Sequence, residues 1–181
     1  MSEIEFWRFT HPLEGENLPA RDLPTLLRSY PYVWLQFLRH LGCMYCKGLV
    51  KDIRAFLESW QDSIRPFLVF VHPNTLEEGR LFFQRFYPGA VHVADPHQRL
   101  YRLFRVRRLR GFWDLRWRDL WEAVKLWRRG LSNEWPKADP LVLHASFLFR
   151  GGQLVWYYYA NSLSDVPNWR KGFSSARAAR A

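Results

Sequence analysis

The stretch Tyr32-Val-Trp-Leu-Gln-Phe-Leu38 is a nearly continuous run of aromatic, β-branched and aliphatic side chains. Such a run predicts a strand that is covered on both faces, because a strand with one solvent-facing side would alternate apolar and polar residues. Residues 67–71 repeat this composition directly after Pro66. Two buried strands of this kind favour a fold in which helices cover both sides of a sheet.

The segment between these strands predicts an amphipathic helix that begins near Cys43. From Cys46 to Trp60 the apolar residues recur at spacings of three and four, while the charged residues fall elsewhere. Thr75-Leu-Glu-Glu78 has the spacing of a capping box and predicts a second helix through about Tyr87.

The rest of the chain continues this alternation. We expect a short strand at 91–94, a helix through about Phe104 that Asp95-Pro96 caps, strands at 141–149 and 154–159 joined by a hairpin turn, a short helix from Asp165, and a frayed tail at 174–181. The order βαβαβα, then ββ and a last helix, predicts a single α/β domain over residues 1–181, with a mixed sheet in three layers.

The composition limits the class of protein. With 181 residues, 48% of them hydrophobic, the chain is large enough for one full core. Two cysteines cannot form the disulfide framework of a small secreted protein. The acidic N-terminal segment lacks the apolar region of a signal peptide, and the longest apolar run, around 30–38, is shorter than the roughly 20 residues that span a bilayer. We therefore expect a cytoplasmic location.

The positive charge is concentrated in one segment. The formal net charge is +10, and Arg99–Arg129 contains eleven Lys or Arg against three Asp or Glu, a local balance of 11 − 3 = +8. Within it, residues 111–131 predict a basic helix inside an insertion at about 105–140. Its apolar residues fall on one face of the helix, and they are Trp113, Trp117, Leu120, Trp121, Val124 and Leu131.

Three arrangements suit this Trp-rich helix. It can lie on an anionic membrane surface, or its arginines and aromatic rings can bind nucleic acid. The simplest arrangement, and the one that we expect, packs the tryptophans over the core or the mouth of an active site and leaves the arginines in solvent. Arg105–Arg129 is then the region that would attract an anionic substrate or an acidic partner, chiefly through Arg105, Arg107, Arg108 and Arg110.

Cys43 and Cys46 form a Cys-x-x-Cys motif where the first strand meets the first helix. A helix N-terminus favours an anion, so Cys43 should have a lowered pKa and enhanced reactivity. Cys46 joins the apolar stripe of the helix and should be more buried. This asymmetry suits a redox dithiol in which Cys43 attacks a substrate and Cys46 resolves the resulting sulfenic acid or mixed disulfide.

Two other interpretations of the motif stay open. A zinc site needs about four ligands, which would have to come from a carboxylate or from His40, His72, His92, His97 and His144. Alternatively, the two cysteines only fill space in the core. The position of the motif, at a strand-to-helix junction within a βαβ pattern, favours the redox dithiol over both.

A family resemblance rests on three stretches, which are Leu38-Arg-His-Leu-Gly-Cys-Met-Tyr-Cys46, Asp95-Pro-His-Gln-Arg-Leu-Tyr-Arg-Leu-Phe104 and Ser146-Phe-Leu-Phe-Arg-Gly-Gly-Gln-Leu-Val155. Over about residues 24–170 the chain resembles the peroxiredoxin-like branch of the AhpC/TSA group, and most closely the selenoprotein-L-like redox proteins. The resemblance implies a thioredoxin-like fold and thiol-dependent reduction of a peroxide or disulfide, with Cys43 as the attacking thiol and Cys46 as its partner.

Two features depart from the family pattern. The Pro-x-x-x-Thr/Ser-x-x-Cys signature of typical peroxiredoxins is absent before Cys43. Where many thioredoxin-like proteins have a cis-proline, the aligned residue is His144, whose peptide should be trans. His144 is a candidate neighbour of Cys43, as an imidazolium or a base, although a local hydrogen bond is its more expected role. Arg39 can stabilise the thiolate or an oxyanion, or it can be a solvated or ion-paired arginine.

The expected function is a thiol-dependent oxidoreductase or peroxidase, an antioxidant enzyme with Cys43, Cys46, Arg39 and His144 as its site residues. No bound cofactor or metal is expected, because the two sulfurs carry the electrons. Thioredoxin, glutaredoxin or glutathione would reduce the enzyme, and a homodimer is left open. The alternative is a non-enzymatic thioredoxin-like module that binds a membrane, nucleic acid or protein through the basic aromatic helix. An exposed dithiol and the resemblance favour the enzyme.

Overall fold

The computed structural model describes residues 6–61, 65–111 and 116–178, and in these ranges it contains one mixed sheet. The sheet has six strands in the order β1-β4-β3-β2-β5-β6. β2, β3 and β4 are parallel, while β1, β5 and β6 each run antiparallel to their neighbours. The strands are β1 (Glu14–Glu16), β2 (Tyr32–Phe37), β3 (Phe67–His72), β4 (His92–Ala94), β5 (Ala145–Arg150) and β6 (Gln153–Tyr159).

The central strand β2 is buried on both faces, as its composition predicts. Trp34 belongs to the cluster of apolar side chains on one face of the sheet, whereas Val33 and Leu35 belong to the cluster on the other. Successive side chains of a strand point to opposite faces. A strand that lies between two apolar layers therefore needs an unbroken apolar run.

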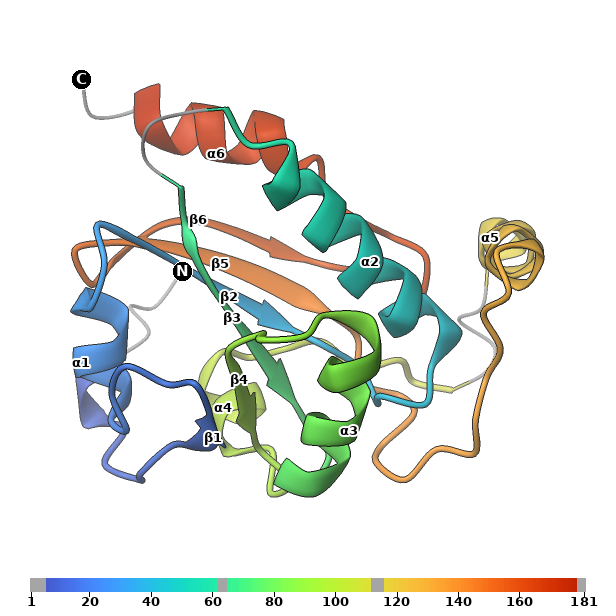
Figure 1. Ribbon diagram of the computed structural model, residues 1–181, viewed down its shortest axis with the longest axis horizontal. Helices are drawn as coiled ribbons and strands as arrows, with labels where there is room; N and C mark the ends of the chain where they lie inside the picture. The colour runs from blue at the N-terminus through green and yellow to red at the C-terminus, as the bar shows by residue number, and fades with distance from the viewer. Residues whose placement is uncertain (1–5, 62–64, 112–115, 179–181) are drawn as a thin grey trace.

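Helices cover both faces of this sheet. The first face carries α2 (Met44–Glu58), α3 (Leu76–Phe86) and α6 (Trp169–Ala178), and the second carries α1 (Leu23–Arg28), α4 (Arg99–Leu103) and the short 3-10 helix η1 (Phe6–Arg8). Figure 1 shows α2 and α6 above the sheet and α1 and α4 below it. The α/β class, the mixed sheet and its three layers are thus confirmed.

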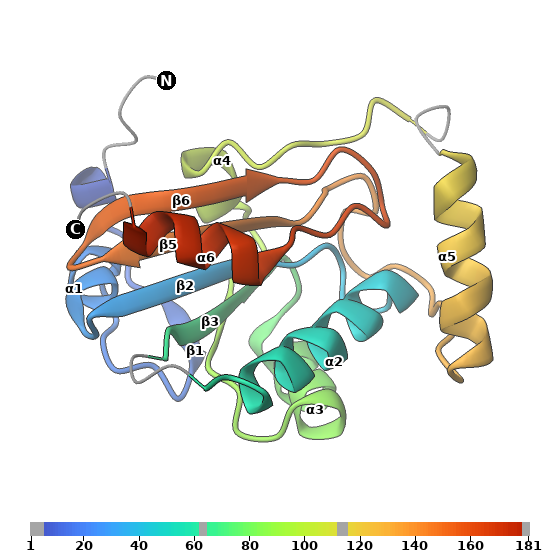
Figure 2. The ribbon, with the colours of Figure 1, turned by 90° about the horizontal axis from the view of Figure 1, so that it is seen from above.

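One helix, α5 (Trp117–Arg128), does not lie over the sheet. In Figures 1 and 2 it stands at one end of the molecule, beyond the N-terminal end of α2. Gly48 of α2 permits this contact, because a Cβ there would lie 2.6 Å from Cδ2 of Leu126. α5 is therefore attached through α2 rather than through the sheet.

Two expected boundaries differ from the observed ones. The strand expected from residue 141 begins at Ala145, because residues 141–143 instead bond to the 107–109 segment, with an isolated bridge between Arg108 and Val142. The helix expected after Asp95 begins at Arg99. The carboxylate of Asp95 still accepts the N–H groups of residues 99–101, so it caps the helix from a distance.

The frayed tail expected at 174–181 is mostly wrong. α6 continues through Ala178, and residues 179–181 lie outside the described ranges. Phe173 anchors this helix, since its buried ring lies 4.9 Å from that of Trp34 and 5.3 Å from that of Trp156, between ring centroids. These rings are far apart in the sequence, and their packing in the folded protein stabilises the helix.

In the part of the chain that is described, no helix has the length and apolar character required to cross a membrane.

We predict that Phe173→Ala lowers the free energy of unfolding by about 3 to 5 kcal/mol, because it removes a fully buried ring from the layer between α6 and the sheet. Urea unfolding followed by circular dichroism measures this loss. Ser174→Ala, at the adjacent exposed position, is the matched control and should leave the transition unchanged. Equal stabilities for the two variants would mean that α6 does not pack as described.

Candidate functional site at the N-terminus of α2

The two cysteines lie at the junction of β2 and α2. Cys43 is the N-cap of α2, with an extended backbone conformation, and its N–H donates to the carbonyl oxygen of His40 at 3.1 Å. Cys46 is in the first turn of the helix. Because β2 lies between β3 and β5, the junction follows the carboxyl end of a strand in the middle of the sheet.

Both cysteine side chains are buried. Cys43 is 2% exposed and Cys46 is 1% exposed, and both are free thiols. Cys43 occupies the helix N-terminus that the sequence predicts for it. The expectation of an exposed dithiol is wrong, because other parts of the chain cover this junction.

The guanidinium of Arg39 directly contacts the sulfur of Cys43. Its Nη1 donates to Sγ of Cys43 at 3.0 Å, its Nε to the carbonyl of Val142 at 2.9 Å, and its Nη2 to the carbonyl of Pro140 at 2.5 Å. Arg39 is buried. Among the described residues no carboxylate forms an ion pair with it, so the negative group available to balance this charge is a Cys43 thiolate.

The pKa of Cys43 is lowered from that of an ordinary thiol. Burial alone would raise it, but a hydrogen bond from the Cys46 thiol, the charge of Arg39 and the backbone N–H groups of Tyr45 and Cys46 together outweigh burial. Neither N–H group forms a fully aligned capping bond to the sulfur. The helix N-terminus and the buried arginine therefore act in the same direction.

The pKa of Cys46 is raised well above its ordinary value. Burial is the main cause, followed by the hydrogen bond that its thiol gives to Cys43 and by the negative charge that develops there. The pair is thus polarised, with Cys43 the thiolate and Cys46 the proton-bearing neighbour. Residues three apart at the start of a helix lie close enough for a disulfide to form between them.

His144 is not placed to stabilise the Cys43 thiolate by charge. Burial lowers the pKa of His144 to about 4, so the imidazole is neutral at physiological pH. Its Nε2 is hydrogen-bonded to the carbonyl of Asp165. The possibility that a charged His144 stabilises the thiolate is therefore wrong, and His144 instead makes the local hydrogen bond that the sequence favoured. No cis peptide occurs in the described residues, so the peptide at His144 is trans as expected.

Residues 131–134, which we call the cover segment, lie along the start of α2. The side-chain oxygen of Asn133 accepts the N–H of Met44 at 2.9 Å, and the N–H of Glu134 donates to the carbonyl of Gly42 at 2.9 Å. Gly42 permits this approach, since a Cβ there would lie 3.2 Å from the Glu134 carbonyl oxygen. The cover segment thus binds the residues on either side of Cys43.

Lys47 holds the cover segment from the other side. Its ammonium donates to the carbonyl of Ser132 at 2.9 Å and to the carboxylate of Glu134 at 2.6 Å. The amphipathic pattern assigned Lys47 to a polar, solvent-facing position, but its side chain is buried. Sequence reasoning missed Lys47 and Asn133, because the partners of both lie more than 80 residues away along the chain, at separations of 85 and 89 residues.

The orientation of α5 also corrects an expectation. Its tryptophans do not cover the core or the active site; Trp117, Trp121 and Trp127 are exposed. The buried side of the helix instead carries Leu126 and Asp119. Trp113 lies outside the described residues, and Leu131 belongs to the cover segment and is buried.

The arginines before α5 are already engaged in part. Arg107 hydrogen-bonds Asn161 and lies over the ring of Tyr159, and Arg108 forms an ion pair with Asp139. These contacts leave the guanidinium groups on the surface but reduce the charge that they present.

A pocket of about 220 Å³ adjoins the dithiol junction at Gly42. One wall is apolar, formed by Leu81, Phe82 and Phe86 of α3, and the rim carries Arg85 and Lys137. Glu134, the last residue of the cover segment, and Trp135 form its other side. The pocket therefore reaches Gly42, the residue directly before Cys43.

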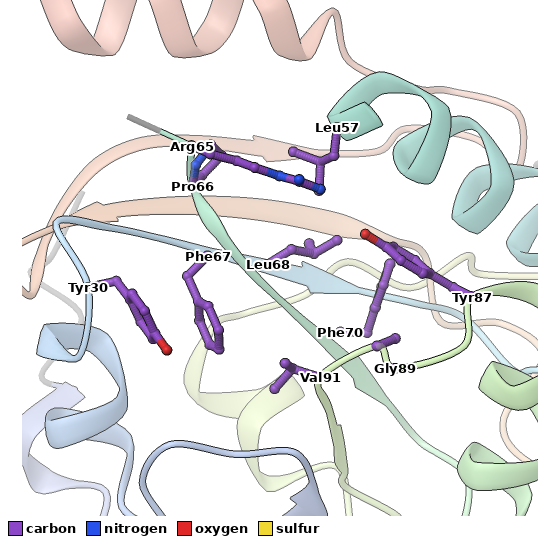
Figure 3. Close-up of a pocket in the computed structure, with 11 residues that line it drawn as sticks. Tyr30, Leu57, Arg65, Pro66, Phe67, Leu68, Phe70, Tyr87, Gly89 and Val91 are labelled. Atoms are coloured by element: carbon purple, nitrogen blue, oxygen red, sulfur yellow. The ribbon is translucent and has the colours of Figure 1, made fainter. Parts of the chain in front are cut away.

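A larger pocket, of about 280 Å³, lies elsewhere (Figure 3). It is lined by the start of β3, where Tyr30 stacks on Phe67 and Arg65 extends toward Leu57. Because β2 and β3 are parallel, the start of β3 is at the opposite edge of the sheet from Cys43. This pocket is not part of the dithiol site.

The histidines considered as zinc ligands do not form a metal site with the two cysteines in the described part of the chain. His72 and His92 bond to each other at 3.0 Å, and His92 also contacts Glu16. Across the described ranges, no three His, Cys, Asp or Glu side chains are placed to hold a metal ion together.

Comparison with known proteins identifies the fold. No protein-family model and no curated protein matches the chain. A cysteine mutant of peroxiredoxin Q from Xanthomonas campestris has a TM-score of 0.61 at 14% identity, over 95% of this chain and 91% of that one. The bacterioferritin comigratory protein of Xanthomonas campestris, described for its alkyl peroxide reduction activity, has a TM-score of 0.60 at 14% identity, over 94% and 90%.

A third solved structure is the DsbE-type thiol:disulfide interchange protein of Chlorobium tepidum, with a TM-score of 0.53 at 13% identity, over 93% of this chain and 91% of that one. Likeness at these identities concerns the fold alone. The chain therefore has a thioredoxin-like fold of the kind found in these peroxiredoxin structures, and the fold that the resemblance implied is confirmed.

We predict that removing the charge of Arg39 raises the pKa of Cys43. In a Cys46→Ser background, whose hydroxyl can still donate to Sγ, Arg39→Met should raise this pKa by on the order of one unit and slow alkylation at neutral pH up to about tenfold. The pH profile of iodoacetamide alkylation, read by mass spectrometry, gives the pKa. Arg39→Lys keeps the charge and is the control. Identical profiles for Met, Lys and Arg at this position would contradict the assigned interaction.

We also predict that the cover segment limits access to Cys43. Asn133→Ala removes a hydrogen bond worth about 1 kcal/mol and should raise the alkylation rate about fivefold, because it raises the population of the open segment. Ser132→Ala is the matched control, since only the backbone carbonyl of Ser132 is used. An unchanged rate for Asn133→Ala, with Ser132→Ala also unchanged, would show that opening elsewhere admits the reagent.

Proposed function

We propose that this protein is a thiol-dependent oxidoreductase that reduces a hydroperoxide or a disulfide through Cys43 and Cys46. The observation that carries the proposal is the buried guanidinium of Arg39, which donates to Sγ of Cys43 and has no carboxylate partner among the described residues. A buried positive charge of this kind favours a thiolate over a thiol. The low-identity fold likeness to peroxiredoxin Q supports thiol chemistry in general.

With a hydroperoxide, the Cys43 thiolate attacks the terminal oxygen and the O–O bond breaks. The sulfur is oxidised to a sulfenic acid, and the alkoxide leaves and takes a proton to become an alcohol. Arg39 is placed to stabilise the negative charge that moves from sulfur to the leaving oxygen. Its N–H groups to the carbonyls of residues 140 and 142 keep the guanidinium in position.

Cys46 then completes the oxidative half of the cycle. The sulfur of Cys46 loses its proton and attacks the sulfur of the sulfenic acid. The S–O bond breaks, hydroxide leaves and takes up that proton as water, and a Cys43–Cys46 disulfide forms. Its raised pKa keeps Cys46 protonated while Cys43 reacts, which keeps the two roles separate. An external thiol reductant returns both electrons. Thioredoxin or glutaredoxin can supply them, or two molecules of glutathione, so no bound cofactor is needed.

The same pair suits a disulfide substrate. The Cys43 thiolate attacks one sulfur to form a mixed disulfide, and Cys46 displaces the substrate thiol. The missing Pro-x-x-x-Thr/Ser-x-x-Cys signature favours this substrate, whereas the apolar wall of the pocket at Gly42 favours a hydroperoxide with an apolar group. We infer that substrate reaches Cys43 from this pocket when the cover segment opens.

A cytoplasmic location and an antioxidant role are part of this proposal, because the dithiol must be returned to the reduced state after each turnover. His144 has no part in the proposed chemistry, since it is neutral and its Nε2 is hydrogen-bonded to a backbone carbonyl. It supports the site only through the position of the 144–145 backbone next to β2.

We predict that the protein consumes an alkyl hydroperoxide when coupled to thioredoxin and its reductase. Cys43→Ser should abolish turnover, because serine is not ionised at neutral pH, and Cys46→Ser should stop the cycle after one oxidation of Cys43. NADPH consumption measures turnover, and a dimedone adduct on Cys43 identifies the sulfenic acid.

The outcomes separate the two substrate classes. Turnover that survives in Cys43→Ser would contradict the proposal. The proposal would be restricted to disulfides if the wild type is inactive with peroxide but reduces a protein disulfide, and if Cys43→Ser loses this disulfide reduction. Arg39→Met should lower the single-turnover rate in either assay, while Arg39→Lys retains more of it.

A further inference from the structure

α5 exposes an unusually apolar face to solvent. The outer face of α5, as we call it, consists of Trp117 (76% exposed), Trp121 (59%), Trp127 (68%), Leu120 and Val124. These positions recur at spacings of three and four residues and therefore form one stripe along the helix. An exposed stripe of three tryptophans with aliphatic residues between them indicates an interaction site.

The inner side of the same helix is held by polar contacts. Asp119 is buried, and its carboxylate accepts the N–H of Ser164 at 2.9 Å and the hydroxyl of Ser164 at 2.6 Å. The hydroxyl of Tyr45 donates to the carbonyl of Asp119 at 2.6 Å. Leu126 packs in the core cluster. The usual order of an amphipathic surface helix is thus reversed, because a carboxylate faces inward and the aromatic rings face outward.

The outer face belongs to a helix that lies at one end of the molecule. α5 is seen along its axis in Figure 1 and from its side in Figure 2. An exposed stripe on a helix in this position can meet a flat surface or the groove of another molecule.

The charges around the stripe favour an anionic surface. Residues 116–129 carry five Lys or Arg against Asp119 and Glu122, a balance of 5 − 2 = +3, and Asp119 is buried. On a helical wheel Arg118 and Lys125 fall along one border of the stripe, and Arg128 falls within it. Long cationic side chains at these positions can reach lipid phosphates while their methylene groups stay with the acyl chains.

A lipid surface fits these observations better than the other occupants do. A second copy docking through the same face would bring two +3 segments together, which opposes a symmetric dimer. Nucleic acid would need its phosphates along the exposed stripe, where aliphatic and indole groups predominate. Tryptophan at the border between apolar and polar media is, by contrast, typical of the membrane interface.

We propose that the outer face of α5 docks this protein onto an anionic lipid bilayer, with the helix axis along the surface and its indole rings at the level of the headgroups. The inference concerns this surface alone. It holds whether or not the dithiol reduces a peroxide, and its test does not use enzyme activity.

The test is co-sedimentation of the full chain with vesicles of phosphatidylcholine containing phosphatidylglycerol, compared with pure phosphatidylcholine. We expect binding to the anionic vesicles, weakened by salt. The triple variant Trp117→Ser/Trp121→Ser/Trp127→Ser should lose about tenfold or more in apparent lipid affinity, because it removes the apolar contribution. Since these side chains are exposed, the variant should fold as the wild type does, which circular dichroism verifies.

Matched control variants distinguish binding through the outer face from nonspecific binding of the protein to lipid. Trp7→Ser removes an exposed tryptophan from η1, at the other end of the molecule, and should not change binding. Arg118→Ser/Lys125→Ser/Arg128→Ser should abolish the preference for anionic lipid, whereas Arg21→Ser/Arg28→Ser/Lys171→Ser removes the same charge elsewhere and should weaken binding less.

Three results would overturn the proposal. The first is no sedimentation with anionic vesicles at low salt. The second is binding that the tryptophan variant leaves unchanged. The third is a dimer in analytical ultracentrifugation that the tryptophan variant dissociates, since this would assign the outer face to a second copy of the chain.

Discussion

The chemistry that we propose depends on one interaction, the contact of the buried Arg39 guanidinium with Cys43 just after the central strand. Arg39 follows β2, which both apolar layers enclose, so its guanidinium cannot reach solvent and must find its partners inside. Two carbonyls from residues 140 and 142 satisfy its polarity but not its charge. Cys43 supplies the group that can become an anion. A charge left unpaired at such a site is costly, so the fold itself favours the thiolate.

The same burial that favours the thiolate also withholds it from substrate. Removing water strengthens the interaction between Arg39 and Cys43, and the cover segment does this by bonding to Gly42, Met44 and Lys47. These bonds are few and join a short segment to the start of α2, so the access that we propose needs only a local opening, which costs less than global unfolding. In the proposed mechanism the closed segment keeps water from the Cys43 site, and the same short segment admits substrate when it opens.

The sequence predicts features that depend on residues close together in the chain. It does not predict features that depend on contacts between residues far apart in the chain. Cys43 could be placed because a buried run must end and an amphipathic pattern begins directly after it. Thr75 could be named as a cap because its box is complete within four residues. Lys47 could not be recognised as buried, because Ser132 and Glu134 bury it. Nor could the sequence decide whether Arg39 stabilises the thiolate or is paired with a carboxylate. Which groups surround its guanidinium is known only once the chain is folded.

The orientation of α5 could not be predicted from its amphipathic pattern. Periodicity states that a helix has two unlike faces, but it does not state which of them the protein covers. Here Ser164 donates to the carboxylate of Asp119 and Tyr45 donates to its backbone carbonyl, and these polar contacts orient the whole helix. Three indole rings are left in solvent as a consequence. Because the helix continues directly into the cover segment, whatever the outer face contacts is connected through a few residues to the bonds that close over Cys43.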